Sequence, residues 1–280
     1  AYSRPDGVLP VSSTLTFWDA VHAIRRRDAR YAPEAYGFVA ATLQAAAMHL
    51  PEERRADPVR RHLSGDFAFI CLTDDASGIR PEVRCLPIPP LNLQLKPGQR
   101  DGAWKKLTTF EADLHGLRGT ALFLDLDVVI VGPLDDFFTQ PGEFLIIHDY
   151  PRFWRFGERV VGNSSVYRFE LGAHADALAY FRGHMDEVPR QYRNEQDFLS
   201  HFLHRQGKLK YWPAAWCPSF KYHSIPTWPS NYWKAPVVPP GARIVIFHGE
   251  VNPPDALVGK RNKRFAFIKP ALWVADAWQA

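Results

Sequence analysis

The chain has 280 residues, of which 46% are apolar and 14% aromatic, so it can build a sizeable hydrophobic core in one large domain or two small ones. Its formal charge is only +4 and its charged residues are interspersed, which argues against the continuous basic stripe of a nucleic-acid-binding surface. No apolar run approaches the roughly 20 residues of a membrane span, so we expect any membrane contact to be peripheral.

The first sixty residues have a helical pattern. Apolar residues recur at helical spacing from 17 to 50, and Pro33 occupies a first-turn position before an Ala-rich run. We predict a helical pair in a segment 1–60, followed by an α/β domain in 61–280, with the boundary near Arg60.

Beyond this boundary, four short apolar runs predict buried strands. They are FAFICL (67–72), ALFL (121–124), FLII (144–147) and RIVIF (243–247). Because they alternate with amphipathic stretches and Pro/Gly-rich turns, they indicate a mainly parallel sheet flanked by helices. Polar residues follow each run at once, and open α/β sheets bind ligands beyond the carboxyl ends of their strands.

The clearest helix follows later in the chain, in NEQDFLSHFLHRQG. Asn194 is a typical N-cap, and Gly207 is a typical stop.

Three cysteines bear on the cellular compartment. Cys71, Cys85 and Cys217 lie far apart and lack metal-binding spacing, which is typical of free thiols in a reducing compartment. The N-terminal stretch AYSRPDGVLPVSS also lacks the apolar segment of a signal peptide. We therefore expect a cytoplasmic protein.

Asp125 and Asp127 directly follow the second predicted strand. Residues i and i+2 of a strand face the same side, so we expect both carboxylates to point into the ligand crevice. Two such charges about 4 Å apart repel by ~4 kcal/mol at an effective dielectric near 20, which a shared proton or a bound cation relieves. Magnesium or manganese completed by phosphate oxygens is the usual cation. The alternative is that one Asp caps a turn and the other is solvated.

Phosphate binding has no standard glycine-rich loop here. The sequence contains neither a Walker A motif nor G-x-G-x-x-G, so phosphates would be bound by a metal and by side chains. Lys106 and Lys221 are the basic candidates, and Lys106 is the better one.

Six stretches, in chain order, resemble bacterial glycosyltransferases of the GT-A fold, in the style of the retaining galactosyl- and glucosyltransferase-like families. They are FAFICLTDD, WKKLTTF, LRGTALFLDLDVVIVGPLDDFF, GNSSVYRF, NEQDFLSHFL and ARIVIFHGEVNPPDAL, and the resemblance covers about 60–278. It implies a Rossmann-like domain that transfers a sugar from a nucleotide-diphosphate sugar, expected to be a UDP-sugar, with Mn²⁺ (or Mg²⁺). The acceptor would be a glycan, a lipid or a small molecule.

Carried over by position, the resemblance implies a donor and metal site. Asp125 and Asp127 would form the D-x-D pair that binds metal, ribose and diphosphate, and His248 would be the third metal ligand. Asp74 would lie near the nucleotide, and Lys106 near the diphosphate.

The resemblance also implies residues at the sugar. Asn163 would contact the donor sugar, and Glu195, Gln196 and Asp197 would lie beneath its ring as the catalytic polar groups.

Two departures from the family pattern affect the donor site. The related motif usually reads His-Gly-x-x-Lys-Pro. Here Gly249 and Asn252 would lie at the donor, but Asn252 replaces the lysine that contacts the diphosphate, so we expect weaker donor binding. The second departure is at the N-terminus.

There, residues 14–57 resemble a small helical bacterial family of unknown function, as if two families were joined at Arg61–Gly65. Our hypothesis is that the first sheet strand and part of the base pocket are absent.

Two other functions are compatible with the sequence. In a phosphohydrolase of the haloacid dehalogenase type, Asp125 would be the nucleophile, although that motif normally continues with Gly-Thr. A catalytically inactive nucleotide-sugar-binding protein is compatible with Asn252 and with the altered N-terminus.

Overall fold

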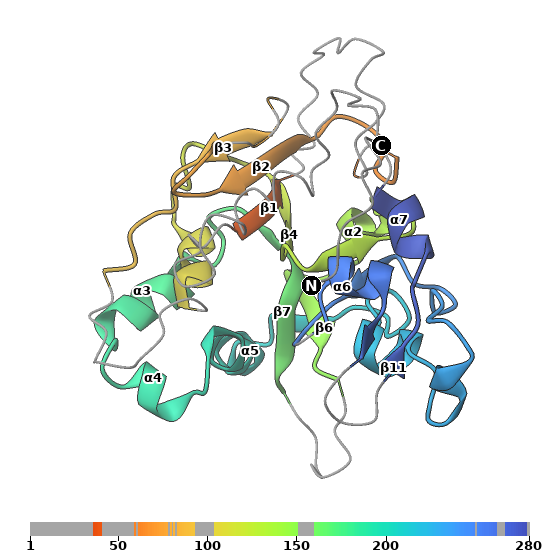
Figure 1. Cartoon of the computed structure of the whole chain (residues 1–280). Coiled ribbons are helices and arrows are strands. Elements are labelled where there is room, and N and C mark those ends of the chain that lie inside the picture. The colour runs from red at the N-terminus through yellow and green to blue at the C-terminus, as the bar shows by residue number, and fades with distance from the viewer. Residues whose placement is uncertain are drawn as a thin grey trace.

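The structure, a computed structural model, describes residues 36–40, 59–92 except 60, 78, 80 and 82, 104–150, 160–249, 251–261 and 267–278. Within these residues the chain forms a seven-stranded sheet, two small two-stranded sheets, and helices on both faces (Figure 1). The predicted α/β class is confirmed.

The large sheet has the strand order β3-β2-β1-β4-β7-β6-β8. Its strands are β1 (Tyr36–Ala40), β2 (Ala68–Leu72), β3 (Arg84–Leu86), β4 (Thr120–Leu124), β6 (Phe144–His148), β7 (Gly162–Glu170) and β8 (Leu209–Tyr211). Five strands share one direction, whereas β1 and β7 run antiparallel to their neighbours. The sheet is therefore mixed and not mainly parallel as predicted, since of its described pairings only β2–β3 and β6–β8 are parallel.

β1 corrects the prediction for the N-terminal segment. Tyr36–Ala40 lie in the predicted helical pair but form a strand between β2 and β4, where Phe38 pairs with Ile70 and Phe123. The sequence YGFVA contains the aromatic residues Tyr36 and Phe38 and the β-branched Val39, which favour a strand over a helix. The prediction of a helix is therefore wrong at 36–40, and the rest of the predicted helical pair lies outside the described residues. Because β1 runs antiparallel to β2, it is not a parallel first strand, and the hypothesis that such a strand and part of the base pocket are absent stays a prediction.

Two small sheets complete the strand set. β5 (Val128–Ile130) pairs antiparallel with β9 (Ile244–Ile246), and β10 (Lys260–Arg261) pairs antiparallel with β11 (Phe267–Ile268). The predicted strand at 243–247 exists, but it joins β5 instead of the main sheet. The helices are η2 (Trp104–Phe110), α2 (Asp135–Thr139), α3 (Ala175–Gly183), α4 (Val188–Gln191), α5 (Glu195–Arg205), η3 (Phe220–Ser224), η4 (Ser230–Tyr232), α6 (Pro253–Val258) and α7 (Trp273–Trp278).

The buried side chains form three clusters. Two of them lie on opposite faces of the main sheet because side chains alternate along its strands. Phe123 and Tyr167 pack with η2, α3 and α5 on one face of the main sheet. Leu122 and Val166 pack with α2 and the β5–β9 pair on the other face. A third cluster lies between β5–β9 and the helices α6 and α7. In Figure 1, α3, α4 and α5 accordingly lie on one side of β7, and α6, α7 and β11 lie on the other.

Further predictions are confirmed in part. α5 begins where predicted, since the Asn194 side chain accepts a hydrogen bond from Asp197 N, and Gly207 follows the helix with a φ of 71°. The three cysteines are free. Among the described residues, no helix combines the length and apolarity needed to cross a membrane.

Candidate functional site

Several polar residues that the sequence singled out lie at one end of the main sheet. This edge is the side on which the strands stop or start, not an outer strand. β2, β4 and β6 run in the same direction and end at this edge, and β7 begins there because it is antiparallel to β4 and β6. Asp125 therefore lies beside the start of β7, where its backbone N donates to Ser165 O at 2.9 Å. This is the edge at which open α/β sheets bind ligands.

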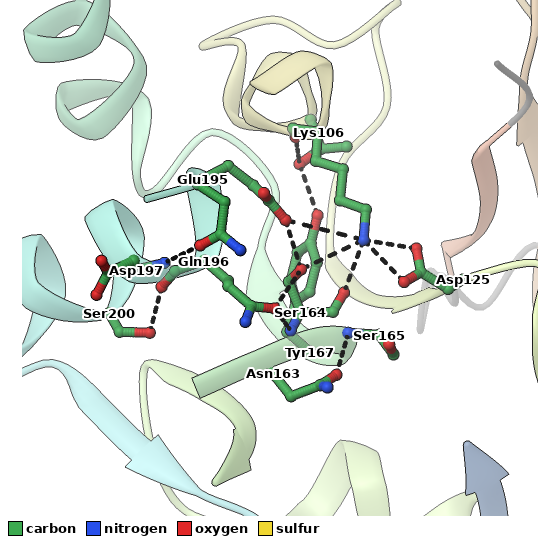
Figure 2. A network of polar contacts seen from close by, with 12 residues as sticks. Lys106, Asp125, Asn163, Ser164, Ser165, Tyr167, Glu195, Gln196, Asp197 and Ser200 are labelled. Carbon is green, nitrogen blue, oxygen red and sulfur yellow. Dashed lines mark hydrogen bonds and ion pairs between the residues drawn. The ribbon is translucent and has the colours of Figure 1, made fainter. Parts of the chain in front are cut away.

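Lys106 is the centre of a polar network at this edge (Figure 2). It extends from η2, and its Nζ lies 2.7 Å from Oδ1 and 2.8 Å from Oδ2 of Asp125. The same ammonium donates to Ser164 Oγ at 3.2 Å and to Ser164 O at 3.4 Å, and lies 3.9 Å from Glu195 Oε1. Its side chain is only 11% exposed, so these contacts replace water around the charge.

The first turn of α5 meets the start of β7 through Ser164. The Ser164 hydroxyl donates to Glu195 Oε1 at 2.7 Å, and Ser164 N donates to Gln196 Oε1 at 3.2 Å. Ser200, one turn further along α5, accepts from Gly162 N at 2.8 Å. The helix N-terminus is thus held against the strand, with Glu195 buried and Gln196 half-buried.

An aromatic pair forms the floor of the network. The Phe123 and Tyr167 rings stack with centroids 4.5 Å apart, and Lys106 Nζ lies 5.5 Å from the Phe123 centroid. The Tyr167 hydroxyl shares a hydrogen bond with Thr109 Oγ1 at 3.1 Å, and burial raises the pKa of this phenol well above its usual value. The floor is therefore uncharged, and it strengthens the electrostatic interactions above it.

Burial and charge act in opposite directions on Lys106. Burial lowers the pKa of its ammonium, but Asp125, Glu195 and Asp127 raise it, and the net pKa lies above its ordinary value. Burial also raises the pKa of Glu195, although Lys106 and the Ser164 hydrogen bond partly oppose that effect. The site is thus built around a persistent positive charge beside a carboxyl group that holds its proton more tightly than a solvated one.

The D-x-D segment is a turn, which corrects the prediction made from strand geometry. β4 ends at Leu124, and 125–127 lead the chain out of the main sheet into β5. The period-two argument therefore does not apply to Asp125 and Asp127. Asp125 instead points to Lys106.

His248 directly follows the residue that lies opposite Asp127, where β9 runs beside β5. That residue is Phe247, whose backbone N donates to Asp127 O at 2.8 Å. His248 Nε2 lies 2.7 Å from the hydroxyl of the buried Ser219, and the His248 ring stacks on Tyr150 with centroids 5.4 Å apart. These contacts fix the imidazole against Ser219 and Tyr150.

The donor chemistry of Asp127 and His248 fits a divalent cation, since one offers a carboxylate and the other an imidazole. Asp125 is engaged differently, because Lys106 bonds both of its oxygens. In the part of the chain that the structure describes, no three His, Cys, Asp or Glu side chains are grouped to hold a metal ion.

The other predicted residues lie at or near the same edge. Asp74 is exposed after β2, two strand positions from β4 and hence roughly 10 Å from it. The Asn163 side chain accepts from Ser165 N at 2.9 Å. Asp197 accepts from Arg193 N at 3.2 Å, and its backbone N is bound by the Asn194 cap, so its contacts lie within its own helix terminus and not with Lys106.

Gly249 and Asn252 lie between β9 and α6. Gly249 is exposed with a φ of 92°. Asn252 is the N-cap of α6, and its backbone N donates to Asp255 Oδ2 at 3.3 Å. Lys221, the second basic candidate, is exposed on η3, with its Nζ 5.5 Å from the centroid of the Tyr222 ring.

Sequence reasoning missed Ser164, Ser219 and Tyr150. Ser164 lies in Gly162–Glu170, whose mixed sequence GNSSVYRFE is not an apolar run, so neither the strand nor the burial of this serine was predicted. Ser219 and Tyr150 lie in loops, and no pattern in the sequence connects them to His248.

No model of a known protein family matches this sequence, and no curated protein matches it either. The site must therefore be interpreted from its own geometry.

Proposed function

We propose that this protein is a glycosyltransferase whose donor is a nucleotide-diphosphate sugar, with a UDP-sugar as the expected donor. The observation that carries the proposal is the convergence of Lys106, Asp125, Ser164 and Glu195 at the end of the sheet where β4 stops and β7 begins. These groups come from η2, the end of β4, β7 and α5. Four separate segments that bring buried polar groups to one point are more typical of a functional site than of a stability element.

A metal ion would be held by Asp127 and His248. Phe247, the residue before His248, donates its backbone N–H to Asp127 O. When bound, Mn²⁺ or Mg²⁺ would neutralise charge on the diphosphate of the donor. Asn252 supplies no positive charge here, so Lys106 is the cation of the chain that would complement the diphosphate.

The sugar would lie over the start of β7 and the N-terminus of α5. Gln196 and Asn163 are exposed enough to contact its hydroxyl groups. Glu195 is 4% exposed, and in this proposal it acts as a positioning residue that orients Lys106 and Ser164. Oriented polar groups of this kind stabilise the positive charge that a sugar acquires as its bond to the diphosphate breaks.

A thermal-shift screen of nucleotide sugars with and without Mn²⁺ tests the proposal. We expect one UDP-sugar to raise Tm only when Mn²⁺ is present. Absence of any shift across the nucleotide sugars contradicts the proposal. A shift without donor hydrolysis or transfer would favour an inactive binding protein, and an acid-stable phosphate on Asp125 from a phosphate ester would favour the phosphohydrolase.

A further inference from the structure

One exposed loop carries an unusual set of aromatic side chains. It runs from Ser224 to Val237, and its two ends are joined by a hydrogen bond from Val237 N to Ser224 O at 3.1 Å. Trp228 is 71% exposed and Trp233 is 60% exposed. Tryptophan is normally largely buried, so two exposed rings on one short loop require an explanation.

Two hydrogen bonds join the loop to β11 and α7. The side chain of the buried Asn231 donates to Phe267 O at 3.1 Å, and Trp273 Nε1 donates to Pro236 O at 3.2 Å. The loop is thereby fixed beside β11 (Figure 1). Its exposed rings are therefore presented outward by anchored backbone.

The exposed apolar surface extends beyond the two tryptophans. Tyr232 is 46% exposed, and its ring lies parallel to that of Phe267 with centroids 6.4 Å apart. Val237 is 59% exposed, and its backbone closes the loop. We call this surface the aromatic patch, defined as Trp228, Tyr232, Trp233, Val237 and Phe267.

The charged side chains within and just before the loop are basic. The loop from Ser224 to Val237 contains no Asp or Glu, and Lys234 is its one charged residue. Lys234 lies in the loop itself and Lys221 precedes it, and both are exposed. A partner that covers this surface is therefore expected to be anionic.

We infer that the aromatic patch docks the protein on a membrane surface that contains anionic lipids. Tryptophan and tyrosine favour the boundary between lipid headgroups and acyl chains, because one end of each ring system is polar and the rest is apolar. Lysines close to such a surface are attracted by its negative charge. The patch supplies both features on one anchored loop, and this inference does not depend on the proposed function.

A sugar is a less suitable occupant. Sugar platforms combine an aromatic ring with polar side chains that bond hydroxyl groups, whereas Val237 continues this patch with aliphatic surface. Asn231 is the amide of the loop, and it is buried with its Nδ2 bonded to Phe267 O.

Membrane docking would also place the candidate site close to the lipid surface. The loop begins directly after η3, whose Tyr222 ring lies 5.4 Å from the ring of His248. A lipid-linked molecule could therefore reach the edge of the sheet without leaving the membrane.

Vesicle flotation with the full chain tests the inference. We expect binding to phosphatidylcholine vesicles that contain phosphatidylglycerol, weaker binding to phosphatidylcholine alone, and a blue shift of tryptophan emission on binding. The double variant W228S/W233S should bind at least about tenfold more weakly. It should keep the wild-type Tm, because both side chains are mostly exposed.

Charge and location are tested by matched variants. K221E/K234E should lose about tenfold or more in affinity for anionic vesicles. Arg190 on α4 and Tyr180 on α3 lie on the opposite side of the sheet from the aromatic patch (Figure 1). The variants Arg190→Glu and Tyr180→Ser should therefore bind anionic vesicles as the wild type does. The inference is overturned if the wild-type chain does not float with anionic vesicles, if W228S/W233S binds normally, or if the loop instead mediates self-association that W228S/W233S abolishes.

Discussion

The ammonium of Lys106 bonds both carboxylate oxygens of Asp125, at 2.7 Å and 2.8 Å, and so joins η2 to the end of β4. The Lys106 side chain is 11% exposed and that of Asp125 is 19% exposed, so water screens this pair only weakly. The pair therefore stabilises the edge of the sheet and also determines how Asp125 can meet a ligand.

Replacing Lys106 with Met should destabilise the protein by about 2 to 4 kcal/mol, because it leaves the carboxylate of Asp125 without its counter-charge. Urea unfolding measures this loss. Lys234→Met, at an exposed position, should change stability by less than about 0.5 kcal/mol. Adding Asp125→Asn to Lys106→Met should restore part of the loss, and strictly additive effects would contradict a direct interaction.

Ser164→Ala should reduce stability by about 1 to 3 kcal/mol, since it removes the donor to Glu195 Oε1 and an acceptor of Lys106. Ser165→Ala is the matched control in the same strand. The hydrogen bonds described for Ser165 use its backbone N and O, which alanine retains. Equal losses in chemical denaturation would refute the role assigned to the Ser164 hydroxyl.

The raised pKa of the buried Glu195 carboxyl group predicts that the stability of the protein depends on pH. Because burial holds the pKa of Glu195 above its ordinary value of 4.5, the folded protein binds this proton more tightly than the unfolded chain. The resulting stability is complete below 4.5 and is lost as pH rises through the raised pKa. The unfolding free energy of the wild type should therefore fall relative to Glu195→Gln across that window, whereas parallel curves would show that Glu195 titrates as a solvated carboxyl.

Asn194→Ala should cost about 1 kcal/mol of stability, because Asp197 N loses its N-cap acceptor. Asn194→Asp retains an acceptor and should remain close to the wild type. If the alanine variant also weakens Tm elevation by a nucleotide sugar while the aspartate variant does not, the cap positions the α5 terminus for binding.

Much of the site could be predicted because local signals and sheet geometry agree there. The apolar runs before Asp125 and His148 are strands, and Asn194 begins α5 as its residue type suggests. Lys106 was singled out from its motif, but its partners could not be, because Asp125 and Ser164 are 19 and 58 residues away along the chain. Long-range contacts of this kind depend on strand order, which the sequence pattern does not encode.

The N-terminal prediction failed at Tyr36–Ala40 because flanking residues with high helix propensity hid a five-residue strand. In the structure this segment pairs with β2 and β4, in agreement with the strand preference of its own aromatic and β-branched residues. The same limit explains β9, which was predicted correctly as a strand but pairs with β5 because the chain turns at the D-x-D segment.

The most direct test of the central claim is hydrolysis of the stabilising nucleotide sugar by the wild type and by Asp127→Asn. With Mn²⁺ the wild type should slowly release free sugar and nucleoside diphosphate. Asp127→Asn should release neither, although its Tm without ligand should stay close to that of the wild type. Release at the wild-type rate by Asp127→Asn, or no release by the wild type with any nucleotide sugar, would contradict the proposal.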